Sequence, residues 1–347
     1  MAQDDEGEVR RKPRFQDIAR EAGVGTATVE RVLNGRSNVS PRMAHRVIVA
    51  ARSLGYDRSL PSLYRARIRI EVVLIRPETE FFSRLSKEFE KIAASADKSI
   101  IIHRSFLQED APYTIARRIE KAAQDRSGLI VVVQDHPAII AALAAADTKG
   151  IPIVLLVSDV QYGGAGVYVG IDNESAGRTA GYFMTRMLGG RHGRVVALCH
   201  SGAYLVHRQR LLGFSRYFPA DSDRLTFAAC LMTRDTDDLS YALVRQALQE
   251  HDDLVGVYHT GGGHLGVDRA LNEFGRSGQV VYIGHELSPA TRLFLASGTI
   301  ALTIDQAPEL QVRRALEVLE TLIGLRKGPP DKSPIPFRVI TRENIGL

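Results

Sequence analysis

The feature that most constrains this chain is an alternation of short apolar runs with amphipathic stretches, which begins near Ile70 and continues through most of the sequence. Runs rich in Val, Ile and Leu, such as 129–133 and 153–157, are separated by stretches such as 137–148, whose apolar residues recur at helical spacing. Continuous apolar strands that alternate with helices are typical of a parallel sheet covered by helices on both faces. The pattern therefore predicts an α/β fold with doubly wound parallel sheets.

The number of strand–helix units is too large for one compact sheet. Further apolar runs occur at 71–75, 99–103, 195–198, 254–258 and 280–283. We therefore expect two similar lobes within residues 70–347, with a cleft between them. In open α/β sheets, ligands bind outside the carboxyl ends of the strands. Residues that directly follow the apolar runs are consequently candidates for a binding site.

The N-terminal part of the chain has a different texture. Residues 15–22 and 26–33 each place apolar residues at helical spacing, and Gly23 lies between them, where a helix must end and the chain turn. A third helix is expected to begin after Ser40, an N-cap residue that is followed by proline. Two short helices joined by a glycine turn predict a helix-turn-helix within residues 14–57.

The positive charge of the chain is concentrated in the same region. Residues 14–69 contain eleven arginines and four acidic residues, a local charge of +7, whereas residues 70–347 sum to −1. Local positive charge is expected of a module that neutralises DNA phosphates. Charge alone would indicate only a solvated face, so the prediction of DNA binding depends on the charge and the helix-turn-helix spacing together.

Composition argues against several other classes of protein. Hydrophobic residues make up 44% of the chain, but no apolar stretch approaches the ~20 residues that a membrane span needs. Residues 1–13 are acidic and then basic without an apolar core, which predicts a disordered tail of a cytoplasmic protein rather than a secretory signal. Cys199 and Cys230 have no partners at metal-ligand spacing, so we expect two inert core thiols, no metal and no cofactor.

Several stretches carry a pattern that hydrophobic periodicity does not explain. They are 17–24, 27–35 and 50–56 in the basic region and 169–177, 210–214, 261–266, 283–286 and 305–308 in the remainder. Together, over nearly the whole chain, they resemble the lactose repressor (LacI) family of bacterial transcription regulators. The effector domain of that family shares its fold with periplasmic sugar-binding proteins.

The resemblance implies a homodimer whose two heads place their second helices in major grooves of a near-palindromic operator DNA, with a hinge at residues 58–69. It also implies the residues that contact DNA. These are Thr26 and Ala27 for reading bases, Arg31 for a base edge or phosphate, Thr28 and Asn34 for phosphates, and Leu63, or else Leu60, as a wedge in the minor groove.

Two residues depart from the family pattern in the second helix of the head. Gly25 stands where a serine usually caps the helix, at a cost of ~0.5 kcal/mol or less. Glu30 replaces a small residue and brings a carboxylate near the phosphates, unless Arg31 or a cytosine amino group receives it. Because the two reading positions are small, DNA shape is expected to carry a larger share of the specificity.

Aromatic rings that could stack on a sugar and polar side chains that follow strands are candidates for binding the effector. The resemblance itself implies two more, an arginine fork that holds ligand hydroxyls or a carboxylate (Arg210) and an amide at the edge of the cleft (Gln306). Together the candidates are Phe81, Phe82, Asp135, Arg210, His264, Glu286 and Gln306. Each has a plainer alternative: the phenylalanines could belong to the core, and Asp135 and Glu286 could cap the helices that follow them. The glycine run 261–263 lacks the Lys-Ser/Thr of a P-loop and predicts only a close-approach turn.

These features predict a sequence-specific DNA-binding transcription regulator, a repressor, whose DNA affinity is controlled by a small sugar or polyol. The alternatives are a regulator with a nucleobase or sugar-acid effector and a sugar-binding protein without a regulatory role. The sequence contains no nucleophile elbow, Walker motif or metal-spaced histidine pair, so we do not expect an enzyme. Closure of the lobes on the ligand is expected to shift the hinge and thereby the two heads.

Overall fold

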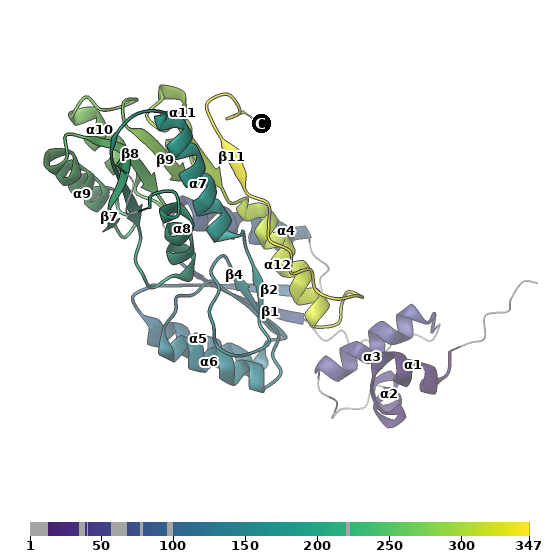
Figure 1. Cartoon of the computed structure of the whole chain (residues 1–347). Helices are drawn as coiled ribbons and strands as arrows, with labels where there is room; N and C mark the ends of the chain where they lie inside the picture. Colours follow the sequence, from purple (N-terminus) through teal and green to yellow (C-terminus); the bar gives the residue numbers. More distant parts are fainter. Residues whose placement is uncertain are drawn as a thin grey trace, which may run out of the picture.

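The computed structural model describes residues 13–34, 39, 41–56, 68–76, 79–95, 100–219 and 223–346. Its N-terminal head consists of three helices packed around a small apolar core that includes Ile18, Val29 and Val47. They are α1 (Phe15–Ala22), α2 (Thr26–Leu33) and α3 (Pro41–Ser53). Gly23 ends α1 with a φ of 60°, a left-handed conformation that favours glycine, so the chain turns directly into α2 (Figure 1). The predicted helix-turn-helix is confirmed.

The first lobe of the body is a five-stranded, fully parallel sheet with helices on both faces. The strand order is β2-β1-β3-β4-β5. Its strands are β1 (Ile68–Ile75), β2 (Ile100–Leu107), β3 (Gly128–Val131), β4 (Ile153–Leu156) and β5 (Val167–Val169). One face carries α5 (Pro112–Asp125) and α6 (Pro137–Thr148), and the other carries α4 (Glu80–Ser95) and α12 (Pro308–Leu322) (Figure 1). We call this unit lobe 1.

The second lobe, lobe 2, is a six-stranded sheet in which only the pairing of β10 with β11 is antiparallel. The strand order is β11-β10-β9-β8-β6-β7. Its strands are β6 (Gly193–Cys199), β7 (Leu225–Met232), β8 (Leu254–His259), β9 (Val281–His285), β10 (Leu302–Asp305) and β11 (Arg338–Ile340). Its helices are α7 (Asn173–Leu188), α8 (Leu205–Ser215), α9 (Asp237–Glu250), α10 (His264–Glu273) and α11 (Pro289–Ser297).

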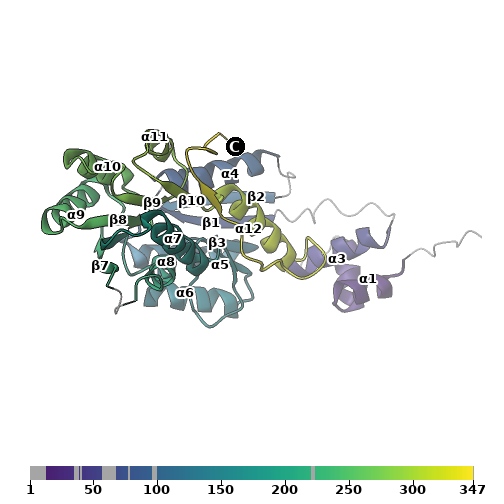
Figure 2. The same cartoon turned by 45° about the horizontal axis from the view of Figure 1, so that its top comes forward.

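The chain passes between the lobes in three places, after β5, after β10 and after α12. Because α12 packs on β3 and β4 of lobe 1 although β10 and β11 belong to lobe 2, the two lobes are interleaved in sequence (Figure 2). The predicted architecture of two doubly wound lobes is therefore confirmed. The carboxyl ends of β1 and β4 in lobe 1 and of β7, β8 and β9 in lobe 2 border the same cavity.

Some elements differ from those expected. Strand β1 begins at Ile68, so the last two residues of the predicted hinge are strand. Strands β5, β7, β10 and β11 had not been expected, because β5, β10 and β11 contain no continuous apolar run of four or more residues, and β7 alternates between exposed and covered residues at the edge of the sheet. The predicted tail and the wedge Leu63 lie outside the described residues.

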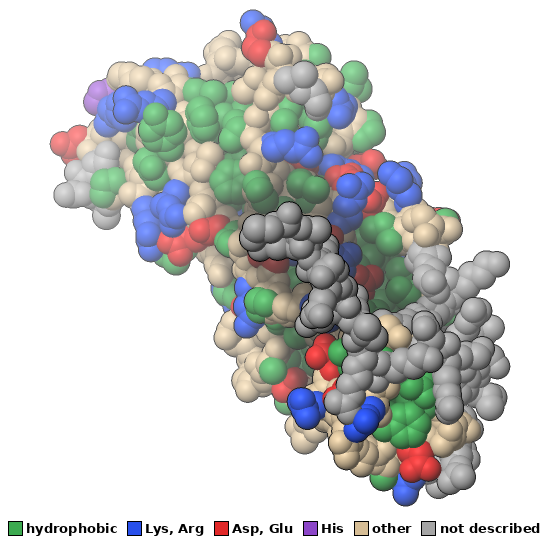
Figure 3. All heavy atoms as spheres, turned by 90° about the vertical axis from the view of Figure 1, so that its right-hand side faces the viewer, with side chains coloured by type: hydrophobic (Ala, Val, Ile, Leu, Met, Phe, Trp, Pro, Cys, Tyr) green, Lys and Arg blue, Asp and Glu red, His purple; other side chains and the backbone are tan. Residues whose placement is uncertain are grey.

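The surface of the body mixes charges of both signs. On the face drawn in Figure 3, acidic and basic side chains lie next to one another rather than in separate fields. Among the residues that the structure describes, no helix is both long and apolar enough to cross a membrane.

Candidate functional site

The exposed face of α2 is the first candidate site. Val29 and Val32 of this helix are buried in the head, while Thr26, Ala27 and Arg31 are exposed on the opposite side. Thr28 is half-buried and Asn34 is exposed directly after the helix. The predicted DNA-contacting residues that the structure describes therefore lie on α2 or at its C-terminal cap. Glu30 of the same helix is also exposed, so a carboxylate is accessible next to Arg31.

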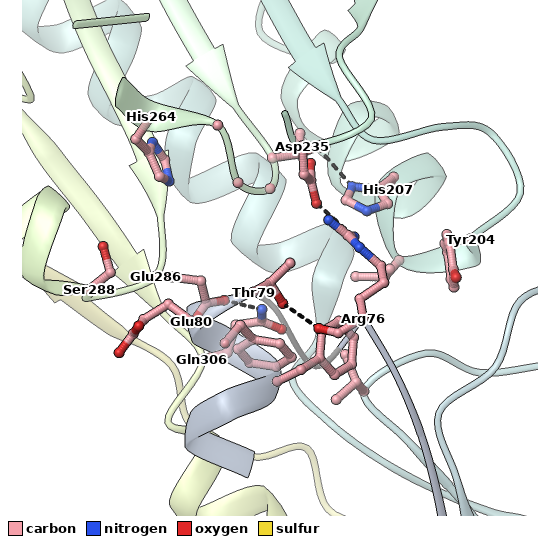
Figure 4. A pocket seen from close by; sticks show the side chains of 18 of the residues that line it. Arg76, Thr79, Glu80, Tyr204, His207, Asp235, His264, Glu286, Ser288 and Gln306 are labelled. Carbon is pink, nitrogen blue, oxygen red and sulfur yellow. Dashed lines mark hydrogen bonds and ion pairs between the residues drawn. The ribbon is translucent and has the colours of Figure 1, made fainter. Parts of the chain in front are cut away.

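The second candidate site is a cavity of about 370 Å³ between the lobes, within the size range of small-molecule sites (Figure 4). Lobe 1 contributes apolar side chains, among them two phenylalanines, together with polar ones such as Thr79 and Glu80, and lobe 2 contributes mainly polar ones. The lining from lobe 1 includes Ile75, Arg76, Phe81, Phe82, Val132, Val157 and Ser158, and the lining from lobe 2 and the crossing after β10 includes Tyr204, His207, Arg210, Asp235, Thr260, His264, Glu286 and Gln306.

Four residues that line the cavity have left-handed backbone conformations although none is glycine. They are Arg76, Val157, Asp235 and Glu286, with φ values of 49°, 70°, 55° and 69°. Such conformations cost of order 1–3 kcal/mol each and persist where the surrounding structure enforces them, commonly at functional sites. Arg76, Val157 and Glu286 directly follow β1, β4 and β9, so the chain turns sharply as it reaches the cavity.

Arg210 of α8 is the most buried cation at the cavity, with only 2% of its surface exposed. Its Nε donates a hydrogen bond to Oδ1 of Asn173 (3.0 Å) and its Nη1 donates to the carbonyl of Thr260 (2.6 Å). Its Nη2 has no hydrogen-bond partner among the described residues. Burial lowers the pKa of Arg210. An unsatisfied donor on a buried guanidinium is costly, so this geometry favours a ligand that supplies an acceptor.

Acceptor atoms face the cavity from Glu286 and Gln306. The amide Nε2 of Gln306 donates to Oε1 of Glu286, while Oε2 of Glu286 and Oε1 of Gln306 have no partner among the described residues. Burial, and then the charge of Asp305, raise the pKa of Glu286 to about 8. Arg84 lies 4.0 Å from Glu286 but is engaged by Asp305 at 2.7 Å and by both carboxylate oxygens of Glu309 at 2.9 Å. The charges of Arg210 and Arg84 lower the pKa of Glu286, but by less than burial and Asp305 raise it.

The two phenylalanines lie in the apolar part of the lining. Their rings meet edge to face, with centroids 5.3 Å apart, and Phe81 is half-buried whereas Phe82 is buried. Ser158 supplies an otherwise unpartnered hydroxyl from the same lobe. The cavity thus presents an apolar wall on one side and hydrogen-bonding groups on the other, which suits a ring with one apolar face.

His264 also lines the cavity, but the protein already uses both of its ring nitrogens. Nδ1 lies 2.6 Å from the hydroxyl of Tyr282 and Nε2 lies 2.9 Å from the carbonyl of His285. Burial lowers the pKa of His264, so the ring is neutral near pH 7. The hydrogen bond to a ligand hydroxyl expected from the sequence therefore has no free nitrogen to make it.

Asp135 lies apart from the lining residues. Its carboxylate forms an ion pair with Arg208 of α8 at 3.0 Å, and both side chains are partly exposed. Asp135 does not lie at a strand end as expected, because β3 ends at Val131, and its carboxylate is held by a cation of the other lobe instead of facing the cavity.

Two further contacts across the cleft were missed in the sequence. Arg76 of lobe 1 forms an ion pair with Asp235 of lobe 2 at 2.9 Å (Figure 4). Glu109 of lobe 1 lies 2.8 Å from Nε2 of His200 of lobe 2. Although burial opposes its ionisation, the charge of Arg76 lowers the pKa of Asp235. Arg76 could have been found in the sequence, because it is a charged residue directly after an apolar run. Its partner Asp235 could not be identified from sequence spacing.

The cysteines differ from the expectation of two core thiols. Cys199 at the end of β6 is buried, as expected, but Cys230 on β7 is exposed, because β7 is the edge strand of its sheet. Their sulfur atoms lie 3.3 Å apart.

Comparison with known proteins gives two matching family models. The one described as "Bacterial regulatory proteins, lacI family" matches residues 14–59, and the one described as "Periplasmic binding protein domain" matches residues 70–327. The chain is 30% identical over 178 residues to the HTH-type transcriptional regulator GalS of Salmonella typhimurium, which covers 50% of the chain and 49% of that regulator. The chain thus spans about half the length of this relative.

Two further likenesses cover most of the body. The ribose import binding protein RbsB of Bacillus subtilis is 24% identical over 249 residues, 71% of the chain and 79% of that protein. A solute binding protein of an ABC transporter from Burkholderia graminis, solved in complex with D-arabinose, superposes with a TM-score of 0.74 at 22% identity, over 81% of the chain and 98% of that protein. The structural likeness bears on the fold of the body.

Proposed function

Because the chain belongs to the lacI family of bacterial regulatory proteins and carries a periplasmic binding protein domain, we propose that it is a cytoplasmic, sequence-specific DNA-binding transcription repressor whose DNA affinity is set by a small sugar or polyol. The head binds operator DNA through α2, and the cavity between the lobes binds the effector. The role is binding and not catalysis.

One observation carries the assignment of the effector: the cavity contains both hydrogen-bond donors and acceptors that are buried and have no partner among the described residues. Nη2 of Arg210 is a donor, and Oε1 of Gln306 and Oδ1 of Asp235 are acceptors. The hydroxyl of Ser158 can donate or accept, and so can the carboxyl of Glu286, because its raised pKa keeps it protonated near neutral pH. A ligand with several adjacent hydroxyl groups satisfies both kinds of group, because each hydroxyl donates and accepts. A nucleobase offers fewer donors to these carboxylates and amides.

The apolar wall orients this ligand. We place the apolar face of a sugar ring against Phe81 and Val157 of lobe 1, and its hydroxyl edge toward Arg210, Glu286 and Gln306. Phe82, which also lines the cavity, packs edge to face against Phe81. Asp135 and His264 are not needed as ligand contacts, because each is already bonded within the protein.

On the DNA side, we propose that Thr26 and Ala27 face bases, that Arg31 reaches a base edge or phosphate, and that Thr28 and Asn34 bind phosphates. A homodimer places two such heads on a near-palindromic operator. Ligand that is bound between the lobes favours one lobe arrangement, and the differential affinity of the two arrangements for operator couples the sites.

The first experiment is a thermal-shift screen of the purified chain against pentoses, hexoses, polyols, sugar acids and nucleobases. A ligand at 100 times its dissociation constant adds ~2.7 kcal/mol to the free energy of unfolding. We expect a hit among the neutral sugars or polyols and no shift for the same ligand with Arg210→Ala. Arg194→Ala, which removes an exposed arginine of the same lobe, is the matched control and keeps the full shift.

The hit then enters a titration against operator selected from a random DNA pool. We expect the ligand to change operator affinity at least fivefold, the lower end of typical allosteric coupling. A ligand that binds without changing operator affinity would refute the coupling. A hit confined to sugar acids would transfer the assignment to an anionic ligand, because Arg210 has no carboxylate within ion-pair distance among the described residues.

A further inference from the structure

Two thiols meet on neighbouring strands of lobe 2, outside the cavity. Strands β6 and β7 pair in parallel, with Ala197 opposite Cys230 and Cys199 opposite Met232. Cys199 and Cys230 are therefore diagonal neighbours on one face of the sheet, and their sulfur atoms are 3.3 Å apart. These are the two cysteines of the whole chain.

The two thiols have unequal environments. Cys199 is 2% exposed, whereas Cys230 is exposed on the edge strand. The hydrogen bond from Cys199 lowers the pKa of the Cys230 thiol, and the same contact, together with burial, raises the pKa of Cys199. Reactive cysteines are accessible and form thiolate readily, often beside a second cysteine that resolves the oxidised sulfur. Cys230 fits the first role and Cys199 the second.

We propose that Cys199 and Cys230 form an oxidative modification site, at which a hydroperoxide converts the two thiols into an intramolecular disulfide. The Cys230 thiolate attacks one peroxide oxygen, so that a sulfur–oxygen bond forms, the oxygen–oxygen bond breaks, and an alcohol or water leaves with a proton. The sulfur of Cys199 then attacks the resulting sulfenic acid. The sulfur–sulfur bond forms, and the hydroxyl leaves as water with the proton of Cys199. Two electrons pass from the sulfurs to the peroxide.

The local backbone permits the small movement that this bond requires. A disulfide needs its sulfur atoms at about 2.05 Å, so they must approach by roughly 1.2 Å. The register of β6 against β7 is irregular between Val195 and Val196, where the pairing skips Ala228 of β7. A bulge on an edge strand, two residues before Cys230, lets β7 shift without disturbing a second neighbour.

The site lies at the base of two contacts that join the lobes. His200, which follows Cys199, lies 2.8 Å from Glu109 of lobe 1. The backbone N–H of Thr233 donates to the carbonyl of Cys199 at 2.8 Å, and Asp235, two residues later, holds Arg76 of lobe 1. A disulfide that moves the ends of β6 and β7 therefore moves both attachments of lobe 2 to the cleft.

The test uses the full chain, reduced and then treated with one equivalent of hydrogen peroxide. We expect the intact mass to fall by about 2 Da, the loss of two hydrogens, and a non-reduced digest to contain the two cysteine peptides joined. Cys230→Ser is expected to slow peroxide consumption at least tenfold, because the remaining thiol is buried. Cys199→Ser, or Cys199→Ala should the serine not fold, is expected to accumulate a sulfenic acid on Cys230 that dimedone traps.

Three results would overturn the proposal. They are two free thiols after oxidation, a disulfide between Cys230 of two chains instead of within one, and peroxide consumption by Cys230→Ser at the rate of the unchanged protein. The thermal unfolding of each variant is measured alongside, so that a variant that does not fold is recognised and replaced. Hydrogen exchange of residues 200–204 and 233–237 is expected to change on oxidation of the unchanged chain and to stay constant in Cys230→Ser.

Discussion

At the scale of single residues, Glu286 is the clearest case of a buried polar group in the cavity that lacks a full set of hydrogen-bond partners. It lies after β9 in a left-handed backbone conformation, and burial with the charge of Asp305 raises its pKa to about 8. The folded protein therefore keeps this carboxyl protonated at neutral pH. One oxygen already accepts from Gln306, and the other is left for a ligand.

This shift predicts a pH dependence of stability. Between the ordinary value of 4.5 and about 8, the unfolded chain is ionised at Glu286 while the folded chain holds the proton. The free energy of unfolding therefore falls as the pH rises through this window, by at most about 1.4 kcal/mol per unit from this group. Glu286→Gln keeps the shape of the side chain but cannot ionise, so this decline should be absent from the variant. We therefore expect the free energy of unfolding of the variant, relative to that of the unchanged chain, to be higher at pH 8 than at pH 5.

Denaturant unfolding of both proteins at pH 5 and pH 8 measures this difference. Glu90→Gln, which alters an exposed carboxyl on α4, is the matched control, and its free energy of unfolding should depend on pH as that of the unchanged chain does. Identical pH profiles of the unchanged chain and Glu286→Gln would show that Glu286 titrates as an ordinary carboxyl.

The sequence could predict those site residues whose position follows from local pattern. Glu286 lies shortly after an apolar run, whereas Arg210 was a candidate because the resemblance to the LacI family implies an arginine there. Contacts that depend on which strands meet were beyond it. His264 is bonded to Tyr282 and to the carbonyl of His285, both of β9, and this pairing of two elements leaves no trace in local spacing.

At the scale of elements, the contact of α7 with α8 positions Arg210. A Cβ placed on Gly177 of α7 would lie 2.0 Å from the carbonyl oxygen of Arg210, and one on Gly213 of α8 would lie 2.1 Å from the carbonyl oxygen of Glu174. The two helices therefore touch backbone to backbone. This close approach brings Asn173 to the guanidinium of Arg210.

Gly213→Ala is expected to force α8 away from α7. Overpacking of this kind costs typically 1–3 kcal/mol, and the displacement should also weaken ligand binding, since it moves Arg210. Denaturant unfolding and the thermal shift with the effector measure the two effects. Gly190→Ala, where an added Cβ meets no atom within 4 Å, is the control and should change neither. An unchanged unfolding midpoint in Gly213→Ala would contradict the close packing.

The start of α2 gives a second prediction at this scale. Gly25 caps the helix without a side-chain hydrogen bond, and an added Cβ would meet open space. A serine there can accept from a free backbone N–H of the first turn, whereas alanine cannot. We expect protection of α2 from hydrogen exchange to rank Gly25→Ser above the unchanged chain and Gly25→Ala below it, each by a few tenths of a kcal/mol or more. Equal protection of Ser and Ala variants would exclude a capping effect.

Some strands could be predicted from the sequence pattern and others could not. Strands buried on both faces, such as β3 and β4, were predictable because their apolar runs are continuous. Strand β7 alternates exposed with covered residues at the sheet edge, and β11 pairs over three residues only. Their strand conformation follows from a neighbour that is distant in the sequence, and composition does not encode it.

At the scale of the whole molecule, buried or partly buried ion pairs join the two lobes around the cavity. Arg76 pairs with Asp235, and Arg84 of α4 pairs with Asp305 at the end of β10. Each pair requires the lobes to be close. The described arrangement is therefore one in which lobe 1 and lobe 2 are held together, and these pairs contribute to the balance between closed and open forms.

Breaking the pair of Arg76 with Asp235 should shift this balance. Both side chains are about one-tenth exposed or less, so removing one partner leaves a nearly buried charge uncompensated, which costs roughly 3–5 kcal/mol. Opening the cleft exposes that charge to water and relieves the cost. We therefore expect Arg76→Met to favour the open form, to increase the radius of gyration in solution scattering, and to weaken effector binding at least tenfold. Arg76→Met combined with Asp235→Leu removes both charges and should recover part of the compactness.

The matched control is Arg194→Met. It breaks an exposed pair with Asp253 within lobe 2, worth about 1 kcal/mol or less, and should change neither the radius of gyration nor the effector affinity. If Arg76→Met alone were as compact as the unchanged chain, the lobes would be held by their three crossings and their apolar contacts, and the ion pair would serve only to shape the cavity.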